Sequence, residues 1–325
     1  MMPQQSLSSA PSSPTPEEPA LRYFVAQRLI GVPTLGRYLQ TLLGIVLWIG
    51  GPPLLARWLA RRVQRRWVHA VERWWARGLR RHLEIKLEIA GLEHIRAGER
   101  YVITPLHEGF ADVIALLHLP LNLRFVARDE LFDWRVLGPY LRDTDQICVS
   151  PENGARIYRH LLRAAQGVVA QGDSIIIFPQ GAILGIETDF HLGAFSLARA
   201  LGRPILPIVL TGSHRVWEHP YTSRLRYGQR LSMRILPPIK AVPQHSAELE
   251  QLRQRLRRQL KTAALSGTMA APRRFIPERD GYWDGYAYRI DPDFPELAAN
   301  IAMHREQFME LPPEQLRETP QPLGG

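Results

Sequence analysis

The sequence contains a single cysteine among its 325 residues. Cys148 has no partner in the chain for a disulfide, and a zinc site built on several thiolates is excluded. It lies in the apolar segment QICVS, where an isolated cysteine usually serves as a small buried hydrophobic residue. We therefore assign Cys148 no chemistry and expect a reducing, cytoplasm-facing location.

Motifs of nucleotide and covalent chemistry are also missing. Neither GxGxxG nor GxxxxGK[ST] occurs, which removes the usual support for nucleotide-dependent chemistry. No serine stands in a GxSxG turn, so the usual nucleophile of an acyl-enzyme mechanism is lacking. We predict neither a metal nor a cofactor.

Acidic residues are outnumbered by basic ones. The chain has 41 Lys and Arg against 31 Asp and Glu, giving a formal net charge of +10. Such an excess points toward an anionic partner, which could be lipid headgroups, phosphate-bearing substrates or nucleic acid. Charge alone does not choose among these three.

The amino-terminal residues 1–20 are rich in Ser, Pro and Gln and hold almost no large apolar side chain. Such a segment cannot offset the entropy of ordering, so we expect a disordered tail. No basic cluster leads into a short apolar run with a small-residue cleavage site, so a secretory signal peptide is not supported.

Residues 21–82 contain the most apolar stretch. Only uncharged residues, YLQTLLGIVLWIGGPPLLA, lie between Arg37 and Arg57, enough as a helix to cross a bilayer core at about 1.5 Å per residue. Two glycines followed by two prolines, Gly50 to Pro53, interrupt this stretch. Because proline lacks a donor and breaks helices, we expect two short helices rather than one straight span.

A basic, Trp-bearing segment follows, with nine arginines between Arg57 and Arg81 and four tryptophans between Trp58 and Trp75. Indoles favour the headgroup level and arginines favour anionic lipid. We interpret the region as a helical hairpin held in the cytoplasmic leaflet of a membrane. The alternatives are a buried helix followed by a solvated basic helix, or an RNA-binding arm that uses Arg and Trp stacking.

From residue 83 to residue 266 apolar runs alternate with helical patterns, which indicates an α/β domain. The expected strands are EIKLEIAG, YVITP, LRFVA, QICVS, SIIIFP, ILPIVL and LSMRIL. Helix-type spacing occupies 152–171 and 193–201. This alternation predicts a mixed, mostly parallel sheet flanked by helices, with active residues at strand ends.

A further helix is expected from Ser246, with one apolar stripe and a solvated Arg-rich opposite face. Its stripe contains Leu249, Leu252, Leu256 and Leu260.

Residues 267–325 form an extension to which we assign no role. The aromatic segment DGYWDGYAY within it is expected to pack onto the core rather than to form a flap.

The segment TPLHEGFADVIALL carries the candidate chemistry. An apolar strand stops at Pro105, His107 follows in a loop, and Asp112 opens an apolar helical run. Five residues apart on one helix the two side chains would diverge by about 140°, so His107 must lie in the non-helical lead-in. A hydrogen-bonded Asp112 can fix the imidazole tautomer while His107 accepts a hydroxyl proton.

Four segments in this order resemble the glycerolipid acyltransferase family: HxxxxD, FVARDELF, FPQG and LPIVLTG. The resemblance covers about 83–239 and includes the amino-terminal apolar helix pair. It implies that His107 is the general base and Asp112 its orienting partner. It also implies substrate-binding roles for Arg128 near the acceptor, for the third motif and for Pro207 in the acyl-groove wall. The third-motif residues are Phe178, Pro179, Gln180 and Gly181, whose turn could offer backbone N–H groups to the thioester oxygen.

The sequence departs from the family pattern where phosphate would be bound. The third motif usually reads FPEGTR, but here Gln180 replaces the carboxylate and Ile183 replaces the arginine. QICVSPEN lacks the acidic-Arg pair often found after that strand, and Glu108 adds a charge beside His107. Since isoleucine cannot bind phosphate, a phosphate-free or larger acceptor gains weight.

The sequence therefore predicts an O-acyltransferase. It would transfer a fatty acyl group from acyl-CoA or acyl carrier protein to a hydroxyl of a lysophospholipid or other lipid-like acceptor, without an acyl-enzyme. Anionic membrane lipids are the expected further partner, the cytoplasmic face of a membrane the expected location, and no nucleic acid is expected. The alternatives are a catalytically inactive lipid-binding protein on the same fold and, less favoured, a basic RNA-binding protein.

Overall fold

A computed structural model describes residues 23–25, 30–62, 65–150, 155–181, 189–217, 225–265 and Asp293. The expectations for the amino-terminal tail, for Ile183 and for the aromatic segment near the carboxyl terminus lie outside the described residues.

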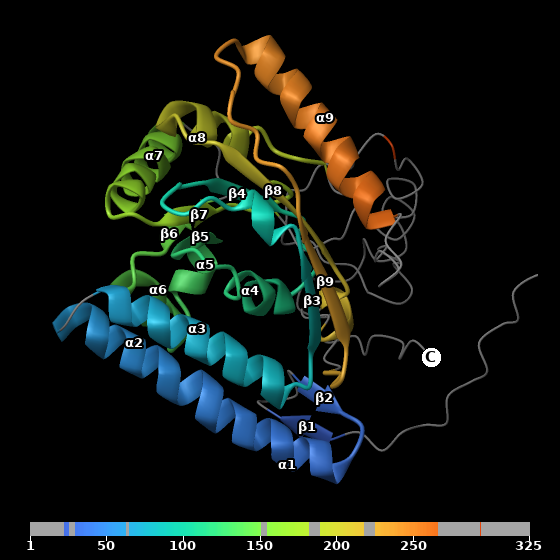
Figure 1. Cartoon of the computed structure of the whole chain (residues 1–325). Coiled ribbons are helices and arrows are strands. Elements are labelled where there is room, and N and C mark those ends of the chain that lie inside the picture. Colours follow the sequence, from blue (N-terminus) through green and yellow to red (C-terminus); the bar gives the residue numbers. More distant parts are fainter. Residues whose placement is uncertain are drawn as a thin grey trace, which may run out of the picture.

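A seven-stranded sheet forms the centre of the described chain (Figure 1), in the order β3-β9-β8-β4-β7-β5-β6. Its strands are β3 (Lys86–Ala90), β4 (Val102–Pro105), β5 (Leu123–Arg128), β6 (Ile147–Val149), β7 (Ser174–Ile176), β8 (Ile205–Thr211) and β9 (Arg230–Ile235). All neighbouring pairs are parallel except β8 and β9. All seven predicted strands are present, and the predicted mixed, mostly parallel α/β fold is confirmed.

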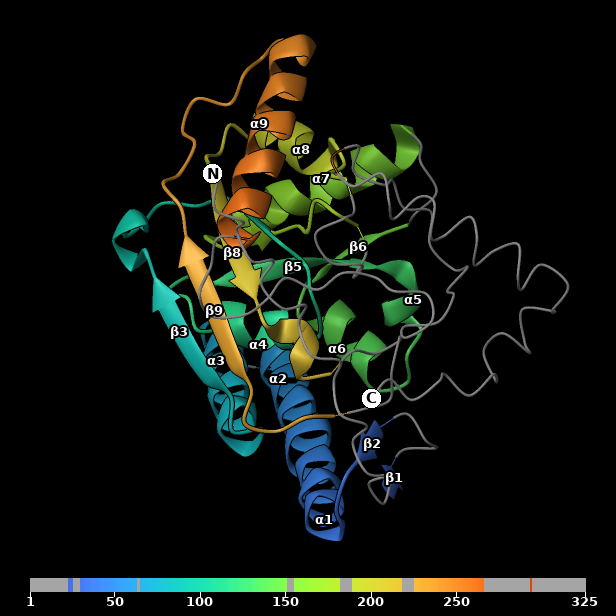
Figure 2. The same ribbon diagram turned by 90° about the vertical axis from the view of Figure 1, so that its right-hand side faces the viewer.

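Helices cover both faces of this sheet (Figures 1 and 2). One face packs α7 (Ala155–Ala170), α8 (Gly193–Leu201) and α9 (Ser246–Leu265), and the other packs α3 (Arg65–His82) and α4 (Ala111–Leu116). Within β4, Val102 joins the α8–α9 cluster while Ile103 joins the α3–α4 cluster. Successive side chains of a strand point to opposite faces, so a strand buried on both sides must be apolar throughout, as the runs in the sequence indicated.

Shorter elements complete the described fold. They are the antiparallel pair β1 (Tyr23–Val25) and β2 (Ile30–Val32), the helices α5 (Asp129–Phe132) and α6 (Leu137–Asp143), and the 3₁₀ turns η2 (Leu92–His94) and η3 (Ser213–Arg215). The sequence analysis did not anticipate the β1–β2 pair, whose three-residue strands are too short to show a period.

The apolar amino-terminal stretch forms one continuous helix, so the expected break at the Gly-Gly-Pro-Pro sequence was wrong. Helix α1 (Leu35–Gly44), a π-helical turn η1 (Ile45–Gly50) and α2 (Gly51–Arg62) together span 28 residues. Proline normally breaks a helix because it lacks an N–H and its ring collides with the carbonyl four residues earlier. The wider π turn directly before Pro52 and Pro53 offers a local change of pitch at which the helix can continue.

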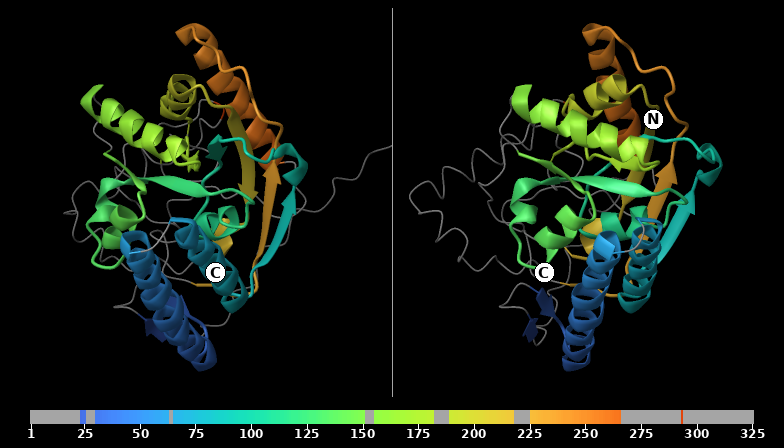
Figure 3. Two further views of the ribbon diagram at one scale, coloured as in Figure 1. Left: turned by 60° about the vertical axis from the view of Figure 1, so that its left-hand side comes forward. Right: turned by 90° about the vertical axis from the view of Figure 1, so that its left-hand side faces the viewer.

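A helical hairpin is nevertheless present, because α3 runs back beside α1–α2 (Figures 1 and 3). The Trp75 indole N–H donates to the Trp48 carbonyl at 2.7 Å, and a Cβ at Gly78 would collide with the Trp48 ring. The two arms therefore approach closely, and the first arm ends at Arg62 rather than at the prolines.

Helix α3 is also part of the protein core, through apolar contacts and a buried charged network. His69 and Glu72 from α3 meet Arg124 of β5 and Asp173, all at most 4% exposed. Burial by itself lowers the pKa of His69, but hydrogen bonds to Asp173 and Glu72 outweigh it and the pKa lies above its ordinary value. The sequence analysis had placed this helix only at the membrane.

The leucine stripe of α9 is fully buried, as predicted. The expectation of a solvated Arg-rich opposite face was wrong in part. Arg255 and Arg258 are exposed, whereas Arg253 and Arg257 are 5% and 3% exposed. Both buried guanidinium groups form ion pairs with Asp189, which a periodicity argument cannot reveal because Asp189 is distant in sequence.

Candidate active site

The loop between β4 and α4 brings His107 and Asp112 together. The strand ends at Pro105 and the helix begins at Ala111, so His107 lies in the non-helical lead-in and Asp112 in the first turn. His107 Nδ1 and Asp112 Oδ2 are 2.7 Å apart, the hydrogen bond that the five-residue spacing predicted.

The Asp112 carboxylate is held by more than the imidazole. Its Oδ2 also accepts the backbone N–H groups of Glu108 at 2.8 Å and Gly109 at 3.0 Å, and the side chain is fully buried. With Nδ1 donating to this fixed oxygen, the lone pair of the neutral ring belongs to Nε2. None of the described residues hydrogen-bonds Nε2 of His107, whose side chain is 16% exposed. The ring can therefore accept a proton from a bound hydroxyl.

The third-motif turn lies against the other side of His107. The Phe178 ring stacks on the imidazole with centroids 3.8 Å apart, and Gln180 Oε1 accepts the His107 backbone N–H at 2.6 Å. An amide oxygen here makes the same contact that the family's glutamate could make without bringing a charge. Gly181 has a φ of +68°, which an L residue rarely adopts, and so permits the turn to reverse at this point.

Two further hydrogen bonds shape this turn and its surroundings. The Gly181 N–H donates to the Phe178 carbonyl at 3.2 Å and closes the turn. Glu108 is 2% exposed and accepts the Gly212 N–H at 2.7 Å. Its carboxylate therefore attaches the His107 loop to the end of β8. This structural role could not be predicted from the position of Glu108 next to His107 in the sequence.

The sheet places Arg128 and Pro207 on strands other than β4, the strand that leads to His107. Arg128 ends β5, which is separated from β4 by β7 and so lies about 10 Å away laterally at the usual strand spacing. Its guanidinium pairs with Glu130 at 2.7 Å. Pro207 is buried in β8 opposite Thr104 of β4, three residues before His107.

Two basic residues that the sequence analysis missed lie at the same edge of the sheet. The His191 ring lies against Gly181, where an added Cβ would be 3.1 Å from it. Arg215 is partly buried in η3, directly after β8. No motif in the sequence indicated His191. Arg215 could have been predicted, because it is a basic residue shortly after the end of a strand.

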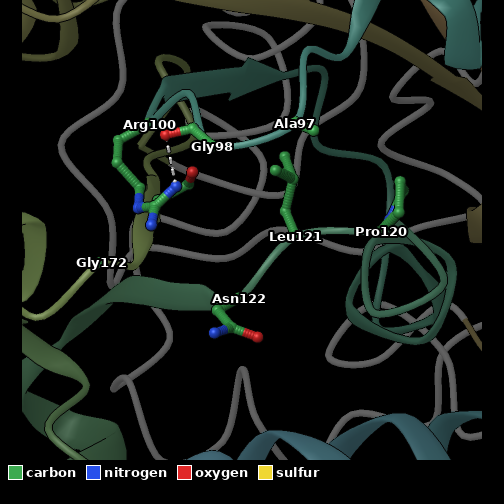
Figure 4. Close-up of a pocket in the computed structure, with 8 residues that line it drawn as sticks. Ala97, Gly98, Arg100, Pro120, Leu121, Asn122 and Gly172 are labelled. Atoms are coloured by element: carbon green, nitrogen blue, oxygen red, sulfur yellow. Dashed lines mark hydrogen bonds between the residues drawn. The ribbon is translucent and has the colours of Figure 1, made fainter.

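A cavity of about 170 Å³ lies at the opposite edge of the sheet (Figure 4). Its lining includes Arg100, Asn122 and Ser174, which stand before or at the start of β4, β5 and β7. The lining holds neither His nor a carboxylate, and Arg100 donates to the Gly98 carbonyl within it. The cavity has no group suited to proton transfer and is separate from the His107 site.

Comparison with known proteins relates this site to one family. The Acyltransferase family profile matches residues 86–211. A chloroplastic 1-acyl-sn-glycerol-3-phosphate acyltransferase of Brassica napus is 27% identical over 175 residues, which are 53% of this chain and 50% of that protein. A protein of the same name from Bacillus subtilis is 25% identical over 128 residues, 39% of this chain and 63% of that protein.

One solved structure shares the fold. The crystal structure of the 1-acyl-sn-glycerophosphate acyltransferase PlsC from Thermotoga maritima aligns with a TM-score of 0.53 and 20% identity, covering 70% of this chain and 96% of that one. The chain spans about half the length of the plant relatives it matches. The profile match includes His107, Asp112, the third-motif turn and β8. The profile match over residues 86–211 and the names of these relatives support a glycerolipid acyltransferase family for the chain.

Proposed function

We propose that the protein is an O-acyltransferase that moves a fatty acyl group from a thioester donor, acyl-CoA or acyl carrier protein, to a hydroxyl of a lipid-like acceptor. The observation that carries this proposal is the His107–Asp112 hydrogen bond at the carboxyl ends of the strands, with Nε2 left to accept a proton. The family-profile match and the names of the relatives support acyl transfer as the reaction.

The proposed reaction is a direct transfer. Nε2 of His107 accepts the acceptor's hydroxyl proton while the hydroxyl oxygen attacks the thioester carbonyl carbon. The resulting tetrahedral intermediate collapses with cleavage of the C–S bond, and the thiolate takes a proton from the imidazolium. An ester forms, a free thiol leaves, and no acyl-enzyme is needed. Asp112 holds the ring and stabilises the imidazolium during this cycle.

We further propose that the long amino-terminal helix attaches the protein to the cytoplasmic face of a membrane. Of an 18-residue apolar window in it, only 22% is buried. Helix α1–α2 exposes a set of large apolar side chains, namely Leu35, Leu39, Leu42, Leu43, Val46, Leu47, Ile49, Leu54, Leu55 and Trp58. Such a surface exceeds what a soluble monomer usually leaves in water. Trp67 and Trp74 of α3 are each 48% exposed and are suited to the headgroup level.

The relatives' names make lysophosphatidate the first candidate for the lipid acceptor. Ile183 supplies no charge for its phosphate, however, and Arg128 is paired with Glu130. We therefore propose that a neutral or larger lipid alcohol is preferred, with phosphate-bearing acceptors merely tolerated.

The experiment that tests the reaction measures thioester consumption by the purified chain with an extracted lipid pool as acceptor. We expect the wild type to consume the donor, and His107→Ala to lower kcat/KM by about 10²- to 10⁴-fold through loss of proton transfer. His160→Ala, an exposed histidine of α7, is the matched control and should retain activity. A stably folded His107→Ala variant with near-normal turnover would reject the mechanism.

A wild type that consumes no donor but retains lipid would favour an inactive binding protein, and salt-sensitive RNA retention would favour the RNA-binding alternative.

Acceptor choice is tested by kcat/KM for lysophosphatidate and for a neutral lipid alcohol. We expect Ile183→Arg to shift the ratio toward lysophosphatidate by about tenfold or more, because a charge-assisted phosphate contact is gained. If Arg128 reaches the acceptor, Arg128→Ala should reduce transfer to phosphate-bearing acceptors more than to neutral ones. Arg255→Ala on α9 provides a control for the loss of one surface charge. A strong preference of the wild type for lysophosphatidate would exclude the altered-acceptor proposal.

Membrane attachment is tested by substitution, because deleting α3 would also remove part of the core. Replacing Leu39, Leu43, Val46 and Leu47 by Gln should release the protein from anionic vesicles in a flotation assay. A fully buried side chain of this size contributes about 1.5–3 kcal/mol, so the combined loss should exceed two orders of magnitude in affinity. All four side chains are exposed, so folding should be retained. Leu92→Gln, an exposed leucine of the core domain, is the control; undiminished binding of the quadruple variant would place the anchor elsewhere.

A further inference from the structure

Two arginines of helix α9 bind Asp189 and Phe190, which lie shortly after the third motif in the sequence. Arg253 Nη1 donates to Asp189 Oδ1 at 2.7 Å and to the Phe190 carbonyl at 2.6 Å. Arg257 Nη1 is 3.4 Å from the same Asp189 oxygen. Asp189, Arg253 and Arg257 are each at most 5% exposed, so these contacts are removed from water.

The contacts continue without a gap from Asp189 to the imidazole. The His191 N–H donates to the Pro179 carbonyl at 2.7 Å, which attaches the segment to the third-motif turn. Within that turn, Gln180 accepts the His107 N–H and Phe178 stacks on the imidazole. A displacement of Asp189 would therefore be passed to the turn that packs against His107.

The charges around Asp189 are balanced by further carboxylates on or near α9. Glu250 binds Arg253, and Asp293 binds Arg257 at 3.0 Å. Burial raises the pKa of Asp189, but the hydrogen bond and charge of Arg253 outweigh it, and the pKa lies below its ordinary value. The carboxylate is thus charged at neutral pH and holds both guanidinium groups.

Stability alone does not explain a buried ion pair of this kind. The desolvation of two charges largely cancels their attraction, and apolar replacements are often neutral or stabilising. The leucine stripe of α9 already packs this helix onto the sheet. The hydrogen bonds of a planar guanidinium have defined directions. The Arg253 contacts therefore fix Asp189 and Phe190 at defined distances from α9.

We propose that Asp189 is a positioning residue for acyl transfer, which α9 holds through Arg253 so that the third-motif turn keeps His107 in its reactive orientation. This inference rests on the proposed function of the His107 site. It assigns no proton transfer and no substrate contact to Asp189.

The first measurement needs no substrate. Hydrogen–deuterium exchange in the 105–112 segment reports the His107 N–H bond to Gln180 and the N–H bonds to Asp112. In Asp189→Asn this segment should exchange about tenfold faster or more, since the turn loses its support, and this increase should exceed any change in a peptide from α3 that reports global opening. Arg255→Gln, an exposed arginine of the same helix, should exchange like the wild type.

The second measurement is kinetic. Asp189→Asn should lower kcat by about 10- to 100-fold with KM for both substrates nearly unchanged, because small misplacements of a catalytic group have effects of that size. Combining it with Gln180→Ala should give a double variant little slower than the slower single variant, since both changes interrupt the same chain of contacts. If Asp189→Asn fails to fold, Arg253→Lys keeps the charge, loses the planar fork, and should show the same changes to a smaller degree.

Unchanged exchange around His107 in a folded Asp189 or Arg253 variant would overturn the inference. So would fully additive effects of Asp189→Asn and Gln180→Ala. An inactive wild type would overturn the proposed function instead, and the exchange experiment would still decide whether Asp189 positions the His107 loop.

Discussion

One oxygen of Asp112 accepts hydrogen bonds from the His107 imidazole and from the backbone N–H groups of Glu108 and Gly109. These three bonds define the loop between β4 and α4, because they fix both its backbone and the side chain it presents. The other parts of the site are arranged around this loop. Gln180 and Phe178 support His107 from the turn after β7, and Glu108 attaches the loop to the end of β8.

The sheet explains why residues so distant in sequence meet here. β4 lies between β7 and β8, and all three run in the same direction. Their carboxyl ends therefore open at one edge, where each contributes the segment that follows it. Helices α7 and α8 cover one face of the sheet, and α3 and α4 cover the other (Figure 2). The candidate active site therefore lies at the edge where the carboxyl ends of the strands meet. The long helix α1–α2 packs on α3, so a membrane bound to it would be held at a fixed position relative to His107.

Features governed by local pattern could be predicted from the sequence, and features governed by distant partners could not. Apolar runs bounded by turn residues gave all seven strands, and the spacing of His107 and Asp112 predicted their hydrogen bond. The helix break predicted at Pro52 and Pro53 was wrong because a π turn lets the helix continue. The partners of Arg253 and Glu108 could not be predicted from the sequence, because Asp189 and Gly212 come from distant segments of the chain. The placement of Arg128 near its own neighbour Glu130 likewise required side-chain geometry.

In the proposed direct transfer, His107 accepts a proton from the substrate and the protein never carries the acyl group. The most direct test is the intact mass of the purified chain after incubation with an acyl-CoA donor and no acceptor, followed by rapid acid quench. Direct transfer predicts an unchanged mass and no thiol release until an acceptor alcohol is added, when both thiol and acylated acceptor appear together. A mass increase equal to one acyl group, formed without acceptor and discharged when acceptor is added, would contradict it.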